Sequence, residues 1–105
     1  MKPIQFMGRS LRTIRDFPND ARRETGHQLD RLQHGLDPGD WKPMPSVGEG
    51  VREIRIRARG QFRVIYIATL PHHIVVLHAF VKKTHKTARR DLDASRRALR
   101  NLKSE

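Results

Sequence analysis

The stretch that decides the fold is VREIRIRARGQFRVIYIATLPHHIVVLHAFV, residues 51–81, which holds three closely spaced β-type runs. Residues 53–58 alternate charged and apolar side chains, as in a strand with one face in water. The run 62–69 is mostly apolar, as expected of a central strand, and the run 74–81 is apolar and β-branched. Because the turns between them are so short, the runs can be joined only as antiparallel hairpins.

Further elements are predicted on both sides of this stretch. They are an edge strand over 3–7, a short helix over 11–16, a second helix from about 18 to 34 and a last helix over 88–102. Ser10 and Thr87 are expected to cap the first and last helix, because hydroxyl oxygens accept hydrogen bonds from the free N–H groups there. Pro18 suits the first turn of the second helix, where its missing N–H is not needed. A loop rich in Pro and Gly is expected over 41–50.

The predicted order is therefore β-α-α-β-β-β-α, which is an α+β fold. A chain of 105 residues leaves no room for a second core, so we expect a single domain over 1–105. The expected sheet is small and antiparallel, with three to four strands and with helices packed on one face. The other face would stay partly open and carry the charged residues of the alternating strands.

The net charge of +11 is the strongest compositional feature, since 22 Lys and Arg stand against 11 Asp and Glu. Such an excess repels itself in the folded state, which indicates a polyanionic partner. Nucleic acid is the commoner partner of a compact basic domain, and no long amphipathic helix with bulky apolar residues favours a lipid surface. The alternative is a generally solubilising positive surface.

Composition also limits the cellular compartment in which the protein is expected and the kinds of bond and metal site that it can form. The chain has no cysteine, so disulfides and thiolate metal sites are excluded. Residues 1–9 lack the apolar run of a signal peptide, and no stretch approaches the roughly 18 apolar residues that a membrane span needs. The expected location is the cytoplasm, without a membrane partner.

Three motifs within residues 51–87 resemble the phage-related branch of the RelE/HigB toxin superfamily. They are VREIR at 51–55, FRVIY at 62–66 and LHAFVKKTHKT at 77–87, of which the last is the most specific. Two earlier segments look like the helix start and the following loop of that branch. These are DFPNDARRE at 16–24 and GLDPGDWKPMP at 35–45. The resemblance thus covers nearly the whole chain in the right order.

The resemblance implies a RelE-like microbial RNase fold with a concave basic face. It implies the toxin of a toxin–antitoxin pair, a ribosome-dependent endoribonuclease that cleaves mRNA in the A site without a metal or other cofactor. The expected partners are mRNA, the ribosome and a cognate helix-turn-helix antitoxin with an acidic patch. Two alternatives remain open: a non-catalytic basic nucleic-acid-binding module and a phage protein that interacts with a host enzyme.

Cleavage of RNA without metal needs a base for the 2′-hydroxyl proton, cations for the charge on the phosphorane and an acid for the departing oxygen. Guanidinium groups suit the second task, because they keep their charge and can hold two phosphate oxygens. The superfamily places a strand arginine at the scissile phosphate, and Arg63 in FRVIY matches that position. The alternative for Arg63 is an ordinary charged residue on a wet strand face.

Basic residues after the third strand supply the other catalytic candidates. Lys82 and Lys83 lie where the superfamily tends to have a catalytic basic residue. Alternation points them to opposite faces, so one of them is expected to reach the phosphate, and Lys83 is slightly favoured for that role. His85 is the candidate general base. Neighbouring lysines, including Lys86, disfavour the imidazolium form and would keep the ring neutral near pH 7. The alternatives are a solubilising strand end and a plain loop histidine.

Other residues are candidates for RNA binding only. Arg55 and Arg57 share a strand face with Glu53, so a salt-bridge ladder explains them nearly as well. Lys86 belongs to the same basic segment as the catalytic candidates. Tyr66 is expected in the core or at its edge, where it could stack on a base.

The remaining histidines do not predict a metal site. His78, in the middle of a strand, is expected to be a hydrogen-bonded structural residue. His27 and His34 lie two helical turns apart, too far to hold one ion, and the adjacent His72 and His73 would point apart.

Overall fold

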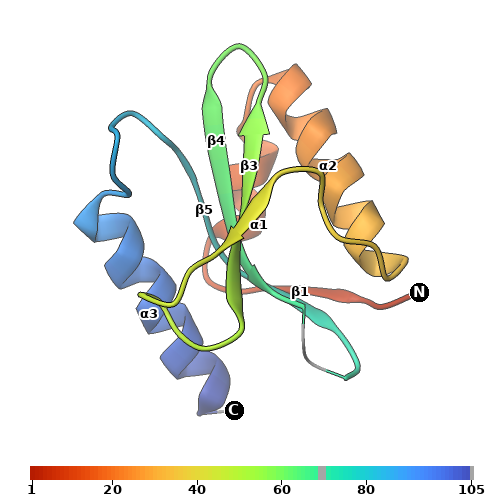
Figure 1. Cartoon of the computed structure of the whole chain (residues 1–105), viewed down its shortest axis with the longest axis vertical. Coiled ribbons are helices and arrows are strands. Elements are labelled where there is room, and N and C mark those ends of the chain that lie inside the picture. The colour runs from red at the N-terminus through yellow and green to blue at the C-terminus, as the bar shows by residue number, and fades with distance from the viewer. Residues whose placement is uncertain (69–70, 105) are drawn as a thin grey trace.

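The computed structural model describes residues 1–68 and 71–104, and these residues form an α+β fold with a five-stranded mixed sheet and three helices. The elements are β1 (Ile4–Phe6), α1 (Ser10–Arg15), α2 (Asn19–Gln33), β2 (Trp41–Pro43), β3 (Val51–Arg57), β4 (Gln61–Ile67), β5 (Ile74–Val81) and α3 (Arg89–Lys103). The sheet order is β1-β5-β4-β3-β2 (Figure 1). The predicted fold class is confirmed, and the fold agrees with the RelE-like one that the resemblance implies.

The centre of the sheet is the antiparallel meander β3-β4-β5 that the alternating pattern predicts. Two short edge strands extend it beyond the expected three to four strands. β1 pairs with β5 in parallel, so the sheet is mixed rather than antiparallel. β2 pairs with β3 inside the segment expected to be a loop. The predicted edge strand over 3–7 is confirmed as β1, whereas the three residues of β2 are too few to show a period, and only the pairing with β3 defines that strand.

Helices lie on both faces of the sheet, which corrects the expectation that they would pack on one face only; the second face is partly open, as expected. The first core joins α1 and α2 to one face, with Phe17, Ile54 and Phe62 among its members. The second core joins α3 to the opposite face, where Leu99 packs with residues such as Ile65. Figure 1 shows α3 on the side of the sheet away from α1 and α2. Since α3 covers only part of its face, the rest is free to carry charge.

Neither predicted hydroxyl cap is formed. α1 begins at Ser10 itself, and the buried Ser10 hydroxyl donates to the carbonyl of Val76 at 3.5 Å instead. α3 begins after Ala88, one residue beyond Thr87, and has no side-chain cap. Pro18 precedes the first residue of α2 and occupies its cap position. The predicted strand over 62–69 ends at Ile67 as β4, and its last residue, 69, lies outside the described residues.

Candidate functional site

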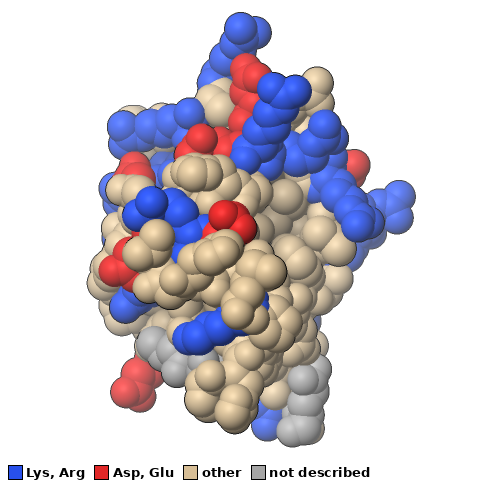
Figure 2. All heavy atoms as spheres, turned by 90° about the vertical axis from the view of Figure 1, so that its right-hand side faces the viewer, with Lys and Arg blue, Asp and Glu red and all other residues tan. Residues whose placement is uncertain are grey.

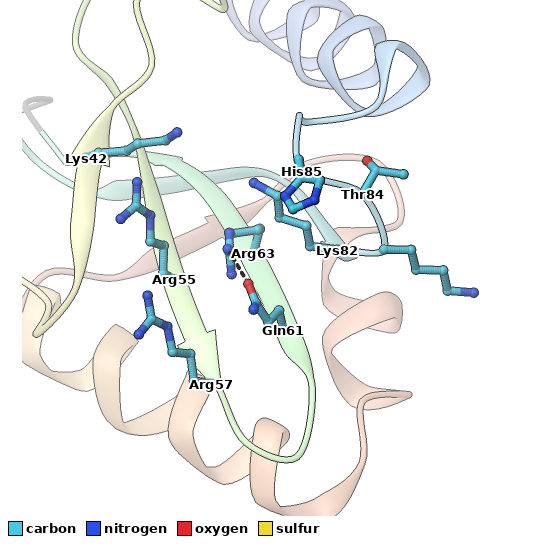
Figure 3. A pocket seen from close by; sticks show the side chains of 9 residues that line it. Lys42, Arg55, Arg57, Gln61, Arg63, Lys82, Thr84 and His85 are labelled. Atoms are coloured by element: carbon cyan, nitrogen blue, oxygen red, sulfur yellow. Dashed lines mark hydrogen bonds between the residues drawn. The ribbon is translucent and has the colours of Figure 1, made fainter.

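The charged side chains of the sheet gather on the part of the second face that α3 leaves uncovered. They surround a hollow of about 500 Å³, which we call the basic pocket. Figure 2 shows Lys and Arg crowding the upper part of the molecule, where the upright view of Figure 1 places the turn between β3 and β4. The described residues that line the pocket (Figure 3) are Lys42, Arg55, Arg57, Gln61, Arg63, Lys82, Lys83, Thr84 and His85.

Strand alternation puts the pocket residues of β3 and β4 on one face. Arg55 lies directly opposite Arg63, and Arg57 lies opposite Gln61. The backbone N–H of Lys82 donates to the Gln61 carbonyl at 2.8 Å and brings the end of β5 alongside β4. In Figure 3, Arg63 and Gln61 accordingly stand between the two arginines of β3 and Lys82. The pocket therefore draws cations from three neighbouring strands.

Arg63 lies at the floor of this pocket and is only 4% exposed. Its Nη1 donates to the Phe62 carbonyl at 3.0 Å, and its Nη2 donates to Oε1 of Gln61 at 2.9 Å. Its Nε lies 3.5 Å from Oε1 of Glu53. Burial lowers the pKa of the guanidinium, and the carboxylate of Glu53 opposes that shift. The alternative of an ordinary residue on a wet face is therefore wrong for Arg63.

Glu53 is wholly buried, although the alternating pattern places it on a wet strand face. Neither carboxylate oxygen has a hydrogen-bond partner among the described residues. Besides Arg63, two cations lie near it: the Arg55 Nε and the Lys42 Nζ are each 3.9 Å from Oε1. A single buried negative charge thus lies beneath the cations of the pocket.

The salt-bridge explanation for Arg55 and Arg57 holds in part. Arg55 reaches Asp40 at 3.8 Å, and Arg57 reaches the other oxygen of Asp40 at 3.9 Å. Asp40 is 43% exposed, so water screens these pairs and leaves both guanidinium groups available to a ligand.

Lys82, Lys83 and His85 all line the pocket, as the family motif led us to expect of catalytic candidates. Lys82 is half-buried, and Lys83 is exposed. Burial lowers the pKa of Lys82, and the positive charge of Arg63 lowers it further. Lys82 is thus the more buried of the two lysines that line the pocket, and which of them takes part in the reaction stays a prediction.

Three lining residues were missed in the sequence: Gln61, Lys42 and Thr84. Gln61 was expected in a turn, yet it begins β4, and alternation from Arg63 would have placed it on the pocket face. Lys42 lies in β2, opposite Glu53, within the segment expected to be a loop. Nothing in the local pattern of that segment indicates a strand.

Two RNA-binding candidates do not line the basic pocket. Tyr66 is wholly buried in the core beneath α1 and α2, on the other face of the sheet, so it cannot stack on a base in this fold. Burial raises its pKa. Lys86 is exposed and lines a smaller neighbouring hollow of about 30 Å³. His78 has the structural role expected of it, since its Nε2 lies 2.8 Å from Oδ1 of Asp91 on α3.

Within residues 1–68 and 71–104, no group of three or more His, Cys, Asp or Glu side chains is arranged to hold a metal ion. Among the helices of the same residues, none combines the length and the apolar character that a membrane crossing requires.

The geometry of the basic pocket suits an extended polyanion. Guanidinium and ammonium groups line it from several elements and can contact more than one phosphate. His85 is exposed in the pocket, and its imidazole can exchange protons with a ligand and with water. Binding of phosphate and transfer of a proton are therefore both possible at one place.

Comparison with known families identifies one match. The family model described as phage-derived protein Gp49-like (DUF891) matches residues 12–100, which include every described residue lining the basic pocket. This family is one of RelE/HigB-like type II toxins. No curated protein matches the sequence. Since the match spans most of the chain, this protein belongs to the Gp49-like family of phage-derived proteins.

Proposed function

We propose that this protein is the toxin of a toxin–antitoxin pair and cuts mRNA on the ribosome. The observation that carries the proposal is the basic pocket, in which six of the nine described lining residues are Lys or Arg and one is a histidine. A non-catalytic RNA-binding surface would need the cations but not a titratable group among them. Membership of a family of RelE/HigB-like toxins supports the same conclusion.

The proposed reaction is attack of a ribose 2′-hydroxyl on the adjacent phosphate. His85 accepts the hydroxyl proton as the 2′-oxygen bonds to phosphorus. Arg63 and Lys82 stabilise the negative charge that the phosphorane acquires. The bond from phosphorus to the 5′-oxygen then breaks, and that oxygen takes a proton from water in the open pocket. The products are a 2′,3′-cyclic phosphate and a 5′-hydroxyl, and His85 returns its proton to solvent.

Dependence on the ribosome follows from how little of the RNA this pocket would hold. No Phe, Tyr or Trp is among its described lining residues, so bases find no large stacking platform. Cations alone attract a backbone without fixing the in-line geometry that the attack requires. The ribosome would supply that alignment.

Induced expression followed by mapping of mRNA 5′ ends tests the proposal. Growth should stop, and new 5′-hydroxyl ends should appear within translated frames. Purified protein should cut mRNA on programmed ribosomes and cut the same RNA feebly without them. Addition of EDTA in amounts that keep ribosomes intact should leave the rate unchanged. Binding of RNA without cleavage would favour the non-catalytic module instead, and efficient cutting of free RNA would contradict the dependence on ribosomes.

The proposed function also requires a neutralising antitoxin. A free basic nuclease would harm its own cell, so a partner must cover the basic pocket. Exposed Arg57 and Lys83 at its edge favour a partner with an acidic patch, which charge would steer into place.

A further inference from the structure

The buried carboxylate of Glu53 is the feature of this fold that the proposed reaction leaves unused. The side chain is wholly buried, and neither oxygen accepts a hydrogen bond from the described residues. Removal of a carboxylate from water is costly unless charge compensates for it. The compensation comes from three cations that lie 3.5 to 3.9 Å from Oε1.

Those three cations belong to the basic pocket and come from three different strands. Lys42 on β2 lies opposite Glu53 in register, Arg55 follows two residues later on β3, and Arg63 lies across from Arg55 on β4. Two like charges directly opposite each other on antiparallel strands repel. The Glu53 carboxylate lies within 4.0 Å of the Nε atoms of both arginines and offsets that repulsion.

Asp40 provides the contrast, because it is a second carboxylate that pairs with Arg55 of β3. It contacts Arg55 and Arg57 at similar distances but is 43% exposed, so water screens it. Glu53 is wholly buried, so solvent screens its charge less and the charge acts more strongly on the guanidinium groups. Only the buried carboxylate also reaches Arg63, the residue at the floor of the pocket.

We propose that Glu53 is a positioning residue: its buried carboxylate holds the Arg63 and Arg55 guanidinium groups in the orientation in which they meet the scissile phosphate. It does not touch RNA and contributes to the rate of cleavage rather than to affinity. The effect of Glu53 on the cleavage rate rests on the proposed function. The orientation of the Arg63 guanidinium by Glu53 can be tested without any activity.

The first measurement is structural and uses the full chain. In an NMR spectrum of the ¹⁵N-labelled protein, the Arg63 Nε–H should give a sharp, slowly exchanging signal, identified by its loss in Arg63→Lys. Glu53→Gln keeps the size of the side chain but removes its charge, and this signal should broaden or exchange at least about tenfold faster. Asp40→Asn, the matched control, should leave it unchanged. An unchanged signal in Glu53→Gln would overturn the holding role.

The second measurement separates rate from affinity on programmed ribosomes. Glu53→Gln should lower the single-turnover cleavage rate at saturating protein by about tenfold to a hundredfold, as small misplacements of catalytic groups do. Affinity for single-stranded RNA should stay equal or become tighter, because a negative charge near the phosphates is gone. Asp40→Asn should change the rate less than about fivefold, as for an exposed ion pair. A merely structural role would lower rate and affinity together.

The outcomes keep the two proposals apart. If the unaltered protein does not cut mRNA, the proposed function fails, and the Arg63 signal still decides whether Glu53 holds the guanidinium. If the unaltered protein cuts and Glu53→Gln cuts equally well, the positioning role is overturned and the function stands. Should Glu53→Gln not fold, Glu53→Asp keeps the charge but withdraws it by one methylene. Loss of cleavage with retained affinity in that variant supports the inference, and an unchanged rate overturns it.

Discussion

Arg63 illustrates how a residue in an apolar strand can be both buried and charged. Its guanidinium has two hydrogen bonds within its own strand and one ion pair with Glu53, and it still borders the basic pocket. An arginine fixed in this way loses little side-chain entropy when a phosphate arrives. Substitution by alanine would leave Glu53 without its nearest cation, so a variant that keeps the charge is the better probe.

Arg63→Lys should reduce cleavage by about a hundredfold, because a preorganised planar donor at the phosphorane is lost while a positive charge remains near Glu53. Single-turnover rates on programmed ribosomes measure this. Arg97→Ala, on the exposed side of α3, is the control. It should weaken binding only slightly and reduce the salt slope of RNA binding by about 0.7 if it meets one phosphate. Equal losses of cleavage in both variants would make Arg63 only another member of the basic surface.

Lys82 should make RNA binding sensitive to alkaline pH. Its pKa is lowered from 10.5 by burial and by Arg63, so the ammonium loses its proton at a lower pH than ordinary lysines do. As pH rises, affinity for a non-cleavable 2′-deoxy oligonucleotide should therefore begin to fall before pH 10.5 is reached. Fluorescence anisotropy can follow this loss. Lys82→Arg should remove this loss, since arginine stays charged. Lys86 lies outside the pocket, so Lys86→Arg should still lose affinity at alkaline pH. If Lys82→Arg loses affinity in the same way, a group other than Lys82 causes the loss.

Tyr66 is the single tyrosine of the chain, so its ionisation can be followed by ultraviolet absorbance. Burial raises its pKa above 10.0 in the folded protein, whereas the unfolded chain ionises near that value. Between the two values the unfolded state binds fewer protons, and the free energy of unfolding should fall as pH rises above about 10. The phenolate should thus form late and together with unfolding. A phenolate that forms near pH 10 in the folded protein would contradict the burial of Tyr66.

α3 is held against the sheet by close packing as well as by hydrogen bonds. Leu99 is buried against the loop after β2, where Gly48 approaches it so closely that a Cβ at residue 48 would collide with Leu99 Cδ2. Near the other end of the helix, the pair between Asp91 and His78 ties α3 to β5. The helix therefore has a defined position, which in turn decides how much of the sheet remains for the basic pocket.

Gly48→Ala should destabilise the protein by about 1–3 kcal/mol, because the added methyl group must displace a buried leucine. Thermal unfolding followed by circular dichroism measures the effect. Gly26→Ala is the matched control, since it lies in α2 with nothing within 4 Å of the added Cβ. That substitution should stabilise the protein by about 1 kcal/mol through helix propensity. A stable Gly48→Ala variant would mean that α3 can shift on the sheet.

The whole molecule is small and highly charged, with extents of 35 × 32 × 23 Å and a net charge of +11. The six cations around the basic pocket account for part of that excess, and they lie where the sheet lacks a helix. Self-repulsion among them lowers the stability of the free protein, and a bound polyanion relieves it. Stability and binding are therefore linked through charge.

Binding of single-stranded RNA should depend steeply on salt. If each of the six pocket cations meets one phosphate, the slope of log K against log salt concentration is about −4. Titrations by fluorescence anisotropy over a range of salt concentrations measure this slope. Arg57→Ala should make it less steep by about 0.7. A slope near zero would show that recognition avoids the basic pocket.

The sequence alone determined the central meander. Period-two alternation between 53 and 58, followed by two apolar runs and short turns, permits one local pairing, and β3, β4 and β5 confirm it. The same alternation placed Arg55 and Arg57 on a common face. The excess of positive charge predicts a nucleic-acid partner, and the resemblance of the segment around His85 implies an endoribonuclease; both stay predictions.

Tertiary structure alone decided the pairing of β1, the face that α3 covers and the burial of Glu53. These features depend on contacts between residues far apart in the chain, which no local period encodes. Glu53 shows the physical reason. Alternation placed it on the charged face, but neighbouring strands surround it with cations that make burial of a carboxylate tolerable. A residue's environment is set by the elements packed around it, and those come together only when the whole chain folds.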